Sequence, residues 1–263
     1  MVAGQKAAQF MNLRHLAQGC AASLAQINAQ APRVHCLTNP VAMTLSANLL
    51  LAVGARPSMT QAADQLDEFI AASAALCVNL GMLDAARREA ITAGLESAAR
   101  HQVPWVLDPV KVHLSATRCA YARQLFSQRP AAIRGNQREL AALATGADLT
   151  GLARATACVI AATGCEDQIS DGHRHHTLIG GSPLMARTIA SGCALSALLA
   201  AFVAVNADPF TASVQALFAY KIAGTRAARR ASGPGSFPAV LLDELAGLNE
   251  ALLLEETACN ESR

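Results

Sequence analysis

Charged side chains are scarce in this sequence, and the few present nearly balance. Asp, Glu, Lys and Arg make up 15% of the 263 residues, and the formal net charge is only +2 at neutral pH. A surface that binds nucleic-acid phosphates or an acidic membrane needs a concentrated positive charge. The composition therefore argues against nucleic acid and against a membrane surface as partners.

Aromatic residues are also few, at 4%, although hydrophobic residues together reach 52%. Alanine supplies much of that share, and its small side chain lets helices lie close to a sheet. So apolar a chain buries a sizeable core, which excludes wholesale disorder. No linker, internal repeat or low-complexity segment interrupts it, so we expect one domain over residues 1–263.

The sequence lacks an apolar run that could cross a membrane. The longest apolar helix candidate, residues 193–205, has about 13 residues, whereas a span needs roughly 20. The first 20 residues contain no continuous hydrophobic segment, so they do not resemble a secretory signal peptide. We therefore expect a soluble protein.

The eight cysteines show no CxxC pair and no regular spacing. Several lie in predicted core strands, such as Cys77 and Cys158, where a free thiol behaves as a small hydrophobe. This usage is typical of a reduced, cytoplasmic protein.

What the chain does contain is a series of apolar runs separated by helical patterns. Such runs are typical of a mainly parallel sheet covered on both faces, so the predicted fold class is α/β. Asp171-Gly172 predicts a hairpin after the last run. We also expect an N-terminal helical extension over residues 1–30 and a tail over 256–263. The predicted strands are 34–37, 75–81, 103–110, 131–136 and 157–164, and the predicted helices include 43–55, 83–101, 191–205, 209–230 and 237–255.

Polar turns follow five of these runs. Because ligands of open α/β sheets bind at the carboxyl ends of the strands, these turns predict a site along one edge. Each turn taken alone is also ordinary loop chemistry. The turns are TNP (38–40), NLG (79–81), DPVKVH (108–113), RGN (134–136) and ATG (162–164).

Two residues after the fourth run admit two readings. Asn136 and Glu139 match a capping box, in which each side chain bonds the other's backbone. They also offer the hard oxygen ligands that suit Mg²⁺, often through water. Both readings can hold together.

Cys193 stands where a turn of small residues enters a long apolar helix. Free N–H groups and the helix dipole make that terminus an anion site, and the same field lowers the pKa of a thiol. The cysteine could fill space, act as a nucleophile, or lie beside a phosphoryl-transfer centre. No histidine is placed near it by sequence, so no nucleophile–base pair can be assembled.

Two further clusters have simpler interpretations. His173, His175 and His176 lie on the predicted hairpin without a carboxylate or thiol at ligand spacing, so we do not expect a metal there. The basic run at 226–230 is most simply a solvated helix end, where cations favour the dipole.

Seven stretches, in this order, resemble the hydroxyethylthiazole kinase family of the ribokinase-like superfamily. The resemblance implies a three-layer α/β/α sandwich and spans residues 34–237 without a change of order. The stretches are VHCLTNPVAMTLSANLLLAVGARPSM (34–59), LCVNLGML (76–83), VPWVLDPVKVHLSATR (103–118), AAIRGNQRELAALA (131–144), VIAATGCEDQISDG (159–172), PLMARTIASGCALSALLAAFVAV (183–205) and GPGSF (233–237).

The family resemblance implies phosphorylation of 4-methyl-5-(2-hydroxyethyl)thiazole by ATP and Mg²⁺, in thiamine salvage. It also implies a homotrimer with active sites between subunits. Most superfamily members have an aspartate where Cys193 stands, so this thiol would help catalysis beside the attacking oxygen. The other implied roles are substrate binding by Met43, Asn39 and Ala190, ATP binding by Arg118 and Thr163, an anion site at Ser191 and Gly192, and Mg²⁺ near Asn136, Glu139 and Asp108.

The chain departs from the family pattern at a few positions. Ala190 stands where the family usually has glycine, and a positive φ there would cost roughly 1 kcal/mol. Lys111 and His113 replace glycines, and Met82 replaces a threonine. These changes leave three alternatives: another heteroaromatic alcohol as substrate, a weakened trimer that only binds thiazole or nucleotide, and, last, a cysteine hydrolase.

Overall fold

The computed structural model of the protein describes residues 13–261, with side chains as far as Thr257. One sheet of eight strands forms its centre, in the order β2-β1-β3-β4-β5-β6-β7-β8. Neighbours from β2 to β6 pair in parallel, and β7 and β8 are antiparallel additions. The strands are β1 (Arg33–Leu37), β2 (Arg56–Ser58), β3 (Ala75–Asn79), β4 (Trp105–Asp108), β5 (Ala132–Asn136), β6 (Val159–Thr163), β7 (Glu166–Ser170) and β8 (His175–Ile179).

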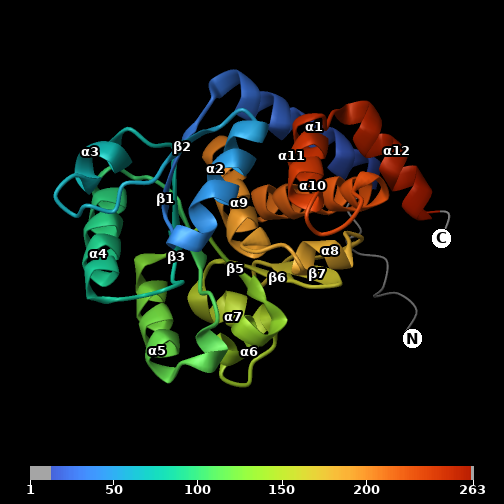
Figure 1. Cartoon of the computed structure of the whole chain (residues 1–263). Helices are drawn as coiled ribbons and strands as arrows, with labels where there is room; N and C mark the ends of the chain where they lie inside the picture. The colour runs from blue at the N-terminus through green and yellow to red at the C-terminus, as the bar shows by residue number, and fades with distance from the viewer. Residues whose placement is uncertain (1–12, 262–263) are drawn as a thin grey trace.

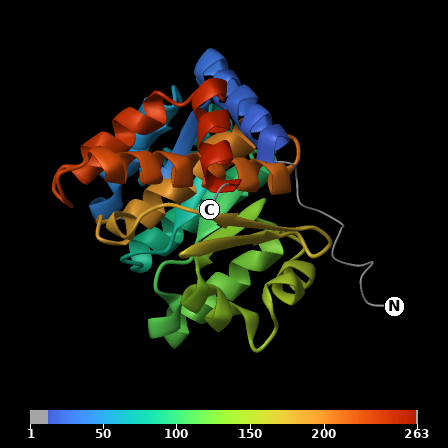
Figure 2. The same cartoon turned by 90° about the vertical axis from the view of Figure 1, so that its right-hand side faces the viewer.

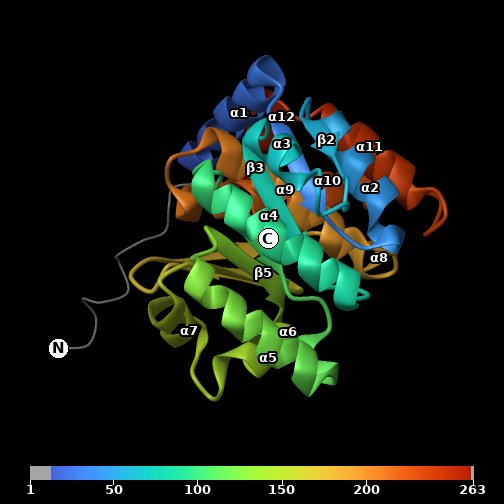
Figure 3. The same ribbon diagram turned by 90° about the vertical axis from the view of Figure 1, so that its left-hand side faces the viewer.

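Helices cover both faces of this sheet and form the outer layers of a three-layer sandwich (Figures 1 and 3). One layer consists of α1 (Leu13–Gln30), α2 (Pro40–Ala52), α9 (Ser191–Val205), α10 (Pro209–Arg230), α11 (Phe237–Ala246) and α12 (Glu250–Glu261). The other consists of α3 (Leu66–Ala71), α4 (Ala85–Arg100), α5 (Ala116–Gln124), α6 (Gln137–Ala144) and α7 (Leu149–Thr156). Three short turns, η1 (Val112–Leu114), η2 (Leu125–Gln128) and α8 (Pro183–Ala186), lie in the connections.

The two layers share the side chains of each strand alternately. In β3, Ala75 and Cys77 pack into the core on the α9 side, while Leu76 and Val78 pack against the α3–α7 layer. Successive strand residues point to opposite faces, and here both faces are buried. That burial explains the continuous apolar runs of the sequence and confirms the predicted α/β class with its mainly parallel sheet.

Helix α9 lies at the middle of its layer, between the sheet and the helices α2 and α10. Eleven of its residues are buried, because a helix covered on all sides can be apolar on all sides. The sheet and its neighbouring helices thereby fix where the first turn of α9 stands.

The predicted hairpin is confirmed: β7 and β8 pair around Asp171-Gly172, and Gly172 has φ +91°. Figure 2 shows this hairpin between the two helix layers, with α10 packed on it. His175 is exposed and His176 buried on β8.

The C-terminal part differs from the sequence prediction in two ways. The single helix expected over 237–255 is two helices, because Gly247 caps α11 and Asn249 Oδ1 accepts from Leu252 N. The tail expected from residue 256 is helical to Glu261, and Glu256 is buried. Residues 1–12 and 262–263 of the expected extension and tail lie outside the described part.

The basic run at 226–230 is a solvated helix end only in part: Arg229 and Arg230 are exposed in the last turn of α10, but all three arginines also make ion pairs. Arg226 and Arg230 pair with the buried carboxylate of Glu244 at 2.6 and 2.5 Å. Arg226 and Arg229 pair with Glu256 at 3.3 and 2.6 Å. These ion pairs join α10 to α11 and α12. They could not be predicted from the sequence, because the paired residues lie far apart in the chain.

Neither a membrane span nor a disulfide is found in the described part of the chain. None of the helices found among residues 13–261 is long and apolar enough to cross a membrane. The seven cysteines whose side chains are described are all free thiols.

Candidate functional site

The predicted polar turns meet at the carboxyl edge of the sheet, where hydrogen bonds and one ion pair join one strand end to the next. Asn39 Nδ2 donates to Asn79 Oδ1 at 2.9 Å, and Asn79 Nδ2 donates to Asp108 Oδ2 at 2.6 Å. Arg134 Nη1 lies 3.9 Å from Asp108 Oδ1, and its Nη2 donates to Thr163 Oγ1 at 2.6 Å. One polar chain therefore crosses the ends of β1, β3, β4, β5 and β6.

Asn39 and Asn79 owe their positions to local backbone chemistry. Asn39 caps α2 by accepting from Val41 N at 3.1 Å, and Pro40 begins the helix earlier than predicted. Asn79 Oδ1 also accepts from Gly81 N at 2.9 Å. A Cβ on Gly81 would lie 2.6 Å from Asn39 Nδ2, so the close approach of the two amides needs this glycine.

Asp108 is the buried carboxylate of the network, only 1% exposed. Burial raises its pKa, and the Glu139 carboxylate raises it further, while Arg134 and hydrogen bonds from Cys193 and Asn79 oppose the rise. A carboxylate in this setting attracts a cation or a proton.

Cys193 stands at the first turn of α9, as predicted, but the expected fall of its pKa is wrong. Burial raises the pKa of the thiol to about 12, the Asp108 charge adds to the rise, and Asn79 and Arg134 counter it. The thiol is therefore protonated at neutral pH. Among the described residues, the groups that shift this pKa include no histidine, which speaks against a cysteine hydrolase.

Arg134 lies in the predicted RGN turn, but the sequence assigned it no role of its own. Its guanidinium packs against the helix start so closely that a Cβ on Gly192 would lie 2.7 Å from Nη1. Its Nε is buried without a hydrogen-bond partner among the described atoms. The signal in the sequence was an arginine inside the apolar run AAIRGN. A buried guanidinium requires polar partners, so this arginine could have been expected to face the polar site.

The backbone that leads into α9 has a positive φ at Ala190, the conformation expected to be costly for a residue with a Cβ. Ala190 has φ 63° and ψ 9°, in the left-handed region. The next residue, Ser191, is held through its hydroxyl and carbonyl by Tyr220 Oη, at 2.8 and 3.1 Å. This anchoring keeps the first turn of α9 in place despite the strain at Ala190.

Asn136 and Glu139 form the predicted capping box of α6. Glu139 N donates to Asn136 Oδ1 at 3.0 Å, and Asn136 N donates to Glu139 Oε2 at 2.8 Å. Lys111 N donates to the other oxygen, Oε1, at 2.6 Å. The helix cap thus aims Glu139 toward the loop that follows Asp108.

This donor set is chemically suitable for magnesium. Asp108 and Glu139 are buried carboxylates close enough for one charge to raise the pKa of the other, so a divalent cation would relieve their repulsion. The oxygens of Asn136, Asp108 and Glu139 are hard ligands, which Mg²⁺ takes alongside several waters. Among the described residues, no three His, Cys, Asp or Glu side chains form a ready-made metal cage.

The remaining predicted residues flank the network. Arg118, in the first turn of α5, donates from Nη1 to Val110 O at 2.8 Å, which holds it over the loop after β4. Met43 is half-buried on α2, one turn beyond Asn39. Among the described side chains, no hydrogen bond or ion pair joins Met43 to the polar chain.

Three of the four departures from the family pattern coincide with backbone strain. Met82 has φ 51°, Lys111 has φ 55° and Ala190 has φ 63°, and none of them is glycine. A left-handed conformation is costly for any residue with a Cβ. The loops after β3 and β4 therefore keep a glycine-type geometry with bulkier side chains.

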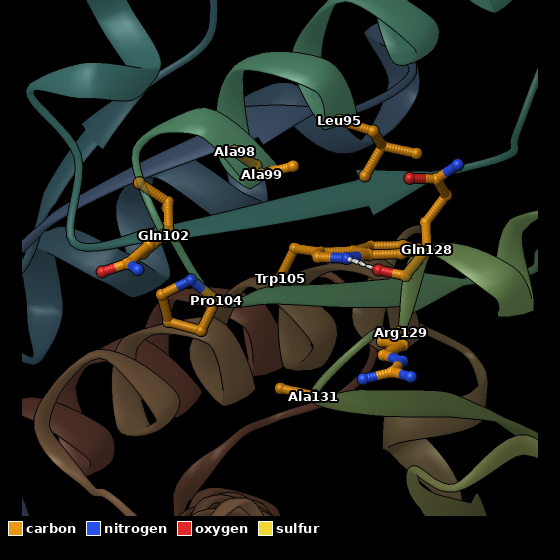
Figure 4. Close-up of a pocket in the computed structure, with 10 residues that line it drawn as sticks. Leu95, Ala98, Ala99, Gln102, Pro104, Trp105, Gln128, Arg129 and Ala131 are labelled. Carbon is orange, nitrogen blue, oxygen red and sulfur yellow. Dashed lines mark hydrogen bonds between the residues drawn. The ribbon is translucent and has the colours of Figure 1, made fainter.

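One cavity lies away from this network. It has about 260 Å³ and is lined by α4, the start of β4 and the η2 turn (Figure 4). Trp105, whose Nε1 donates to Gln128 O at 3.0 Å, opens β4, whereas Asp108 closes it. The cavity therefore belongs to the opposite edge of the sheet.

Comparison with known proteins agrees with this geometry. A model of the hydroxyethylthiazole kinase family matches residues 24–151 and 144–251. A hydroxyethylthiazole kinase of Serratia proteamaculans is 41% identical over 243 residues, covering 86% of this chain and 92% of that protein. One from Escherichia coli is 41% identical over 231 residues, covering 81% and 88%.

Solved structures give the same picture. A hydroxyethylthiazole kinase protein from Pyrococcus horikoshii superposes with a TM-score of 0.86 at 34% identity, covering 90% of this chain and 96% of that one. A Bacillus subtilis pyridoxal kinase superposes with a TM-score of 0.58 at 16% identity, covering 74% and 92%. The second likeness shows the fold alone, and the two together confirm the ribokinase-like sandwich.

Proposed function

The chain belongs to the hydroxyethylthiazole kinase family, and from this premise we propose how its own residues divide the transfer of a phosphoryl group from ATP to the thiazole alcohol. As a kinase it is a phosphotransferase with an alcohol acceptor. The observation that carries the proposal is the polar chain from Asn39 to Thr163, which runs beneath the first turn of α9.

The start of α9 would stabilise the charge that develops on the transferred phosphoryl group. Amides in the first turn of a helix have no carbonyl partner within it. Ser191 N donates to Thr188 O at 3.3 Å, so the amides of Gly192 and Cys193 would face the anion, with the Ser191 hydroxyl beside them. The Arg134 guanidinium beside Gly192 adds a fixed positive charge. Preorganised charge of this kind is the main source of catalysis in phosphoryl transfer.

Cys193 would help to place the attacking hydroxyl rather than remove its proton. Its thiol, with a pKa of about 12, is a poor base at neutral pH. Phosphoryl transfer depends mainly on positioning and electrostatics and tolerates a weak base. Loss of Cys193 should therefore slow catalysis without abolishing it.

Magnesium, when bound, would neutralise charge on the ATP phosphates. Asp108 and Glu139 would hold it, with Asn136 and waters completing its shell, because these side chains supply hard oxygen donors at one place. Arg118 and Thr163 would hold ATP from either side of that shell. Met43, Asn39 and the backbone of Ala190 would hold the thiazole, where a soft thioether suits an aromatic sulfur ring.

Exposed apolar side chains around the site support a homotrimer with active sites between subunits. Val41, Met82, Leu114 and Ile189 are 59%, 59%, 72% and 76% exposed. Each lies in or beside a segment that supplies the candidate site. Exposed apolar side chains that accompany one polar site favour a surface that another subunit covers. We place this trimer in the cytoplasm, because its thiols are free.

The loop after β4 supports a second candidate substrate, another alcohol that would accept the phosphoryl group in the same reaction. Lys111 is exposed beside Glu139, with a side chain where the family pattern has glycine. A heteroaromatic alcohol that carries an extra anionic group would pair with this lysine. Comparing such an alcohol with the thiazole in one assay decides between the two.

The test is ADP production from ATP and Mg²⁺ with 4-methyl-5-(2-hydroxyethyl)thiazole. We expect thiazole-dependent turnover in the wild type. Cys193→Ala should lower kcat by about tenfold or more, and Glu139→Ala should raise the Mg²⁺ requirement as well. Thiazole binding by calorimetry with no ADP release in the wild type would show a binder and overturn the proposal.

A further inference from the structure

Lys221, on α10, is a buried cation outside the site described above. Its side chain is 5% exposed, and its Nζ lies near four oxygens. It donates to the carbonyls of Gly180, Cys165 and Gly164 at 3.1, 3.2 and 3.3 Å, and lies 3.3 Å from Asp167 Oδ1. A charge this deep is stable only when it is paired and fully hydrogen-bonded, as here.

The four oxygens belong to the two segments that flank the candidate anion site. Gly164 directly follows Thr163, and it is held at both ends, because Asp167 Oδ1 accepts from Gly164 N at 2.9 Å. Gly180 ends the β7–β8 hairpin and starts the segment that leads to Ala190. The ammonium therefore fastens the turn after β6 to the segment that enters α9.

Neighbouring residues of α10 hold the same segments. Tyr220 bonds Ser191, and Thr225 Oγ1 accepts from Gly181 N at 2.9 Å. Figure 2 shows α10 lying over the hairpin. One helix thus provides a rigid base for both sides of the site, and Lys221 supplies the only charge among these three anchors.

The chemistry of this arrangement is that of a bound monovalent cation. A lysine ammonium is a compact point charge with three donors on a flexible stem. Three carbonyl oxygens and one carboxylate around it form the oxygen shell that a free potassium or ammonium ion would take. Burial raises the pKa of Asp167, and the Lys221 charge opposes that rise, as expected for a carboxylate that faces a cation.

We propose that Lys221 is a positioning residue that serves as a built-in monovalent cation, fixing the Gly164–Cys165 turn and Gly180 so that Thr163 and the start of α9 face ATP together. The inference rests on the proposed role of Thr163 in holding ATP. It requires that the KM of the wild-type kinase for ATP not depend on which monovalent cation is in solution, because Lys221 already fills this position.

The experiment removes the tethered charge and offers a free one. Lys221→Ala leaves a space for an ion, whereas Lys221→Met fills that space without charge. ADP production is followed by chromatography, because coupling enzymes respond to potassium themselves. Each variant is assayed in tetramethylammonium salt and then with potassium, ammonium or methylammonium at constant ionic strength.

We expect Lys221→Ala to raise the KM for ATP about tenfold or more in tetramethylammonium, since several bonds to a charged donor are lost. Ammonium or potassium should recover much of that loss. Lys221→Met should show the loss without recovery, and the wild type should respond to neither ion. The matched control is Arg229→Met. It removes another cation of α10, one that pairs with Glu256 on α12, and it should leave the KM for ATP unchanged.

Wild-type KM values for ATP in both Lys221 variants would overturn the inference. An equal loss in both, with native melting curves and no ion response, would show a structural role only and would overturn it too. Wild type and Thr163→Val run in the same assay test the proposed function separately. If the wild type fails to turn over thiazole, an ion-dependent melting temperature of Lys221→Ala still decides the cation question.

Discussion

Ala190 is a residue at which this chain accepts backbone strain next to its chemistry. Its φ of 63° lies in the left-handed region, where a Cβ costs roughly 1 kcal/mol. Glycine would relieve the strain, although it also gains entropy in the unfolded chain. The strain persists because Tyr220 anchors the following residue, Ser191.

Ala190→Gly should raise the free energy of unfolding by up to about 1 kcal/mol and also change the KM for the thiazole. Urea denaturation and initial-rate kinetics measure the two effects. Ala157→Gly is the matched control, because Ala157 has φ 51° at the end of α7, away from the site. It should gain similar stability and leave kinetics unchanged. A stability loss in Ala190→Gly would contradict the strain argument.

At the scale of elements, the C-terminal helices are joined by charge as well as by apolar packing. Glu244 on α11 is 3% exposed and accepts from Arg226 and Arg230 on α10. Burial alone would raise the pKa of Glu244, but the two arginines outweigh it, and the pKa lies below its ordinary value of 4.5. The folded state therefore favours the charged carboxylate.

Glu244→Gln should lower the free energy of unfolding by about 1 to 3 kcal/mol at neutral pH, because it leaves two arginines without their carboxylate. A carboxylate with a depressed pKa stabilises the fold above its unfolded pKa and loses this effect as the pH falls through the folded value. The gap between wild type and variant should therefore narrow in acid. Urea curves at neutral and acidic pH test this, with the exposed neighbour Asp243→Asn as control; a gap independent of pH would contradict it.

The elements that sequence patterns predicted are those buried on both faces. β1, β3, β4, β5 and β6 are long apolar runs, and their parallel order follows from the helices between them. β2 was missed because it has three residues, one of them proline, at the edge of the sheet. The end of α12, from residue 256, was predicted as a tail because the arginines that pair with its buried Glu256 lie some 30 positions earlier.

Sequence patterns also located only part of the candidate site, because they do not show contacts between residues far apart in the chain. Strand-end turns placed Asn39, Asp108 and Thr163 on one edge, because parallel strands end together. The RGN turn placed Arg134 on the same edge without a role, and Lys221 was missed, since the partners of a charged residue inside an apolar pattern lie far along the chain. Asp108 lies 26 positions from Arg134, and Gly180 lies 41 positions from Lys221.

At the scale of the whole molecule, four of the seven exposed large apolar side chains in the described part, Val41, Met82, Leu114 and Ile189, lie in or beside segments that supply the candidate site. Val41 follows the α2 cap, and Ile189 precedes the strained Ala190. A monomer gains nothing from apolar side chains there, whereas a trimer would bury them and close the site to water. The proposed trimer therefore makes assembly and activity depend on the same residues.

Val41→Asp should shift the sedimenting species from trimer toward monomer and lower kcat/KM with it. The new carboxylate lies in the first turn of α2, where the helix dipole favours it, so the fold should persist. Leu51→Lys is the matched control: Leu51 is also 59% exposed, and it lies in the last turn of α2, where a cation is favoured. It should keep both the mass and the activity. Analytical ultracentrifugation at several protein concentrations, run beside the ADP assay, decides the outcome, and a fully active wild-type monomer would contradict a site shared between subunits.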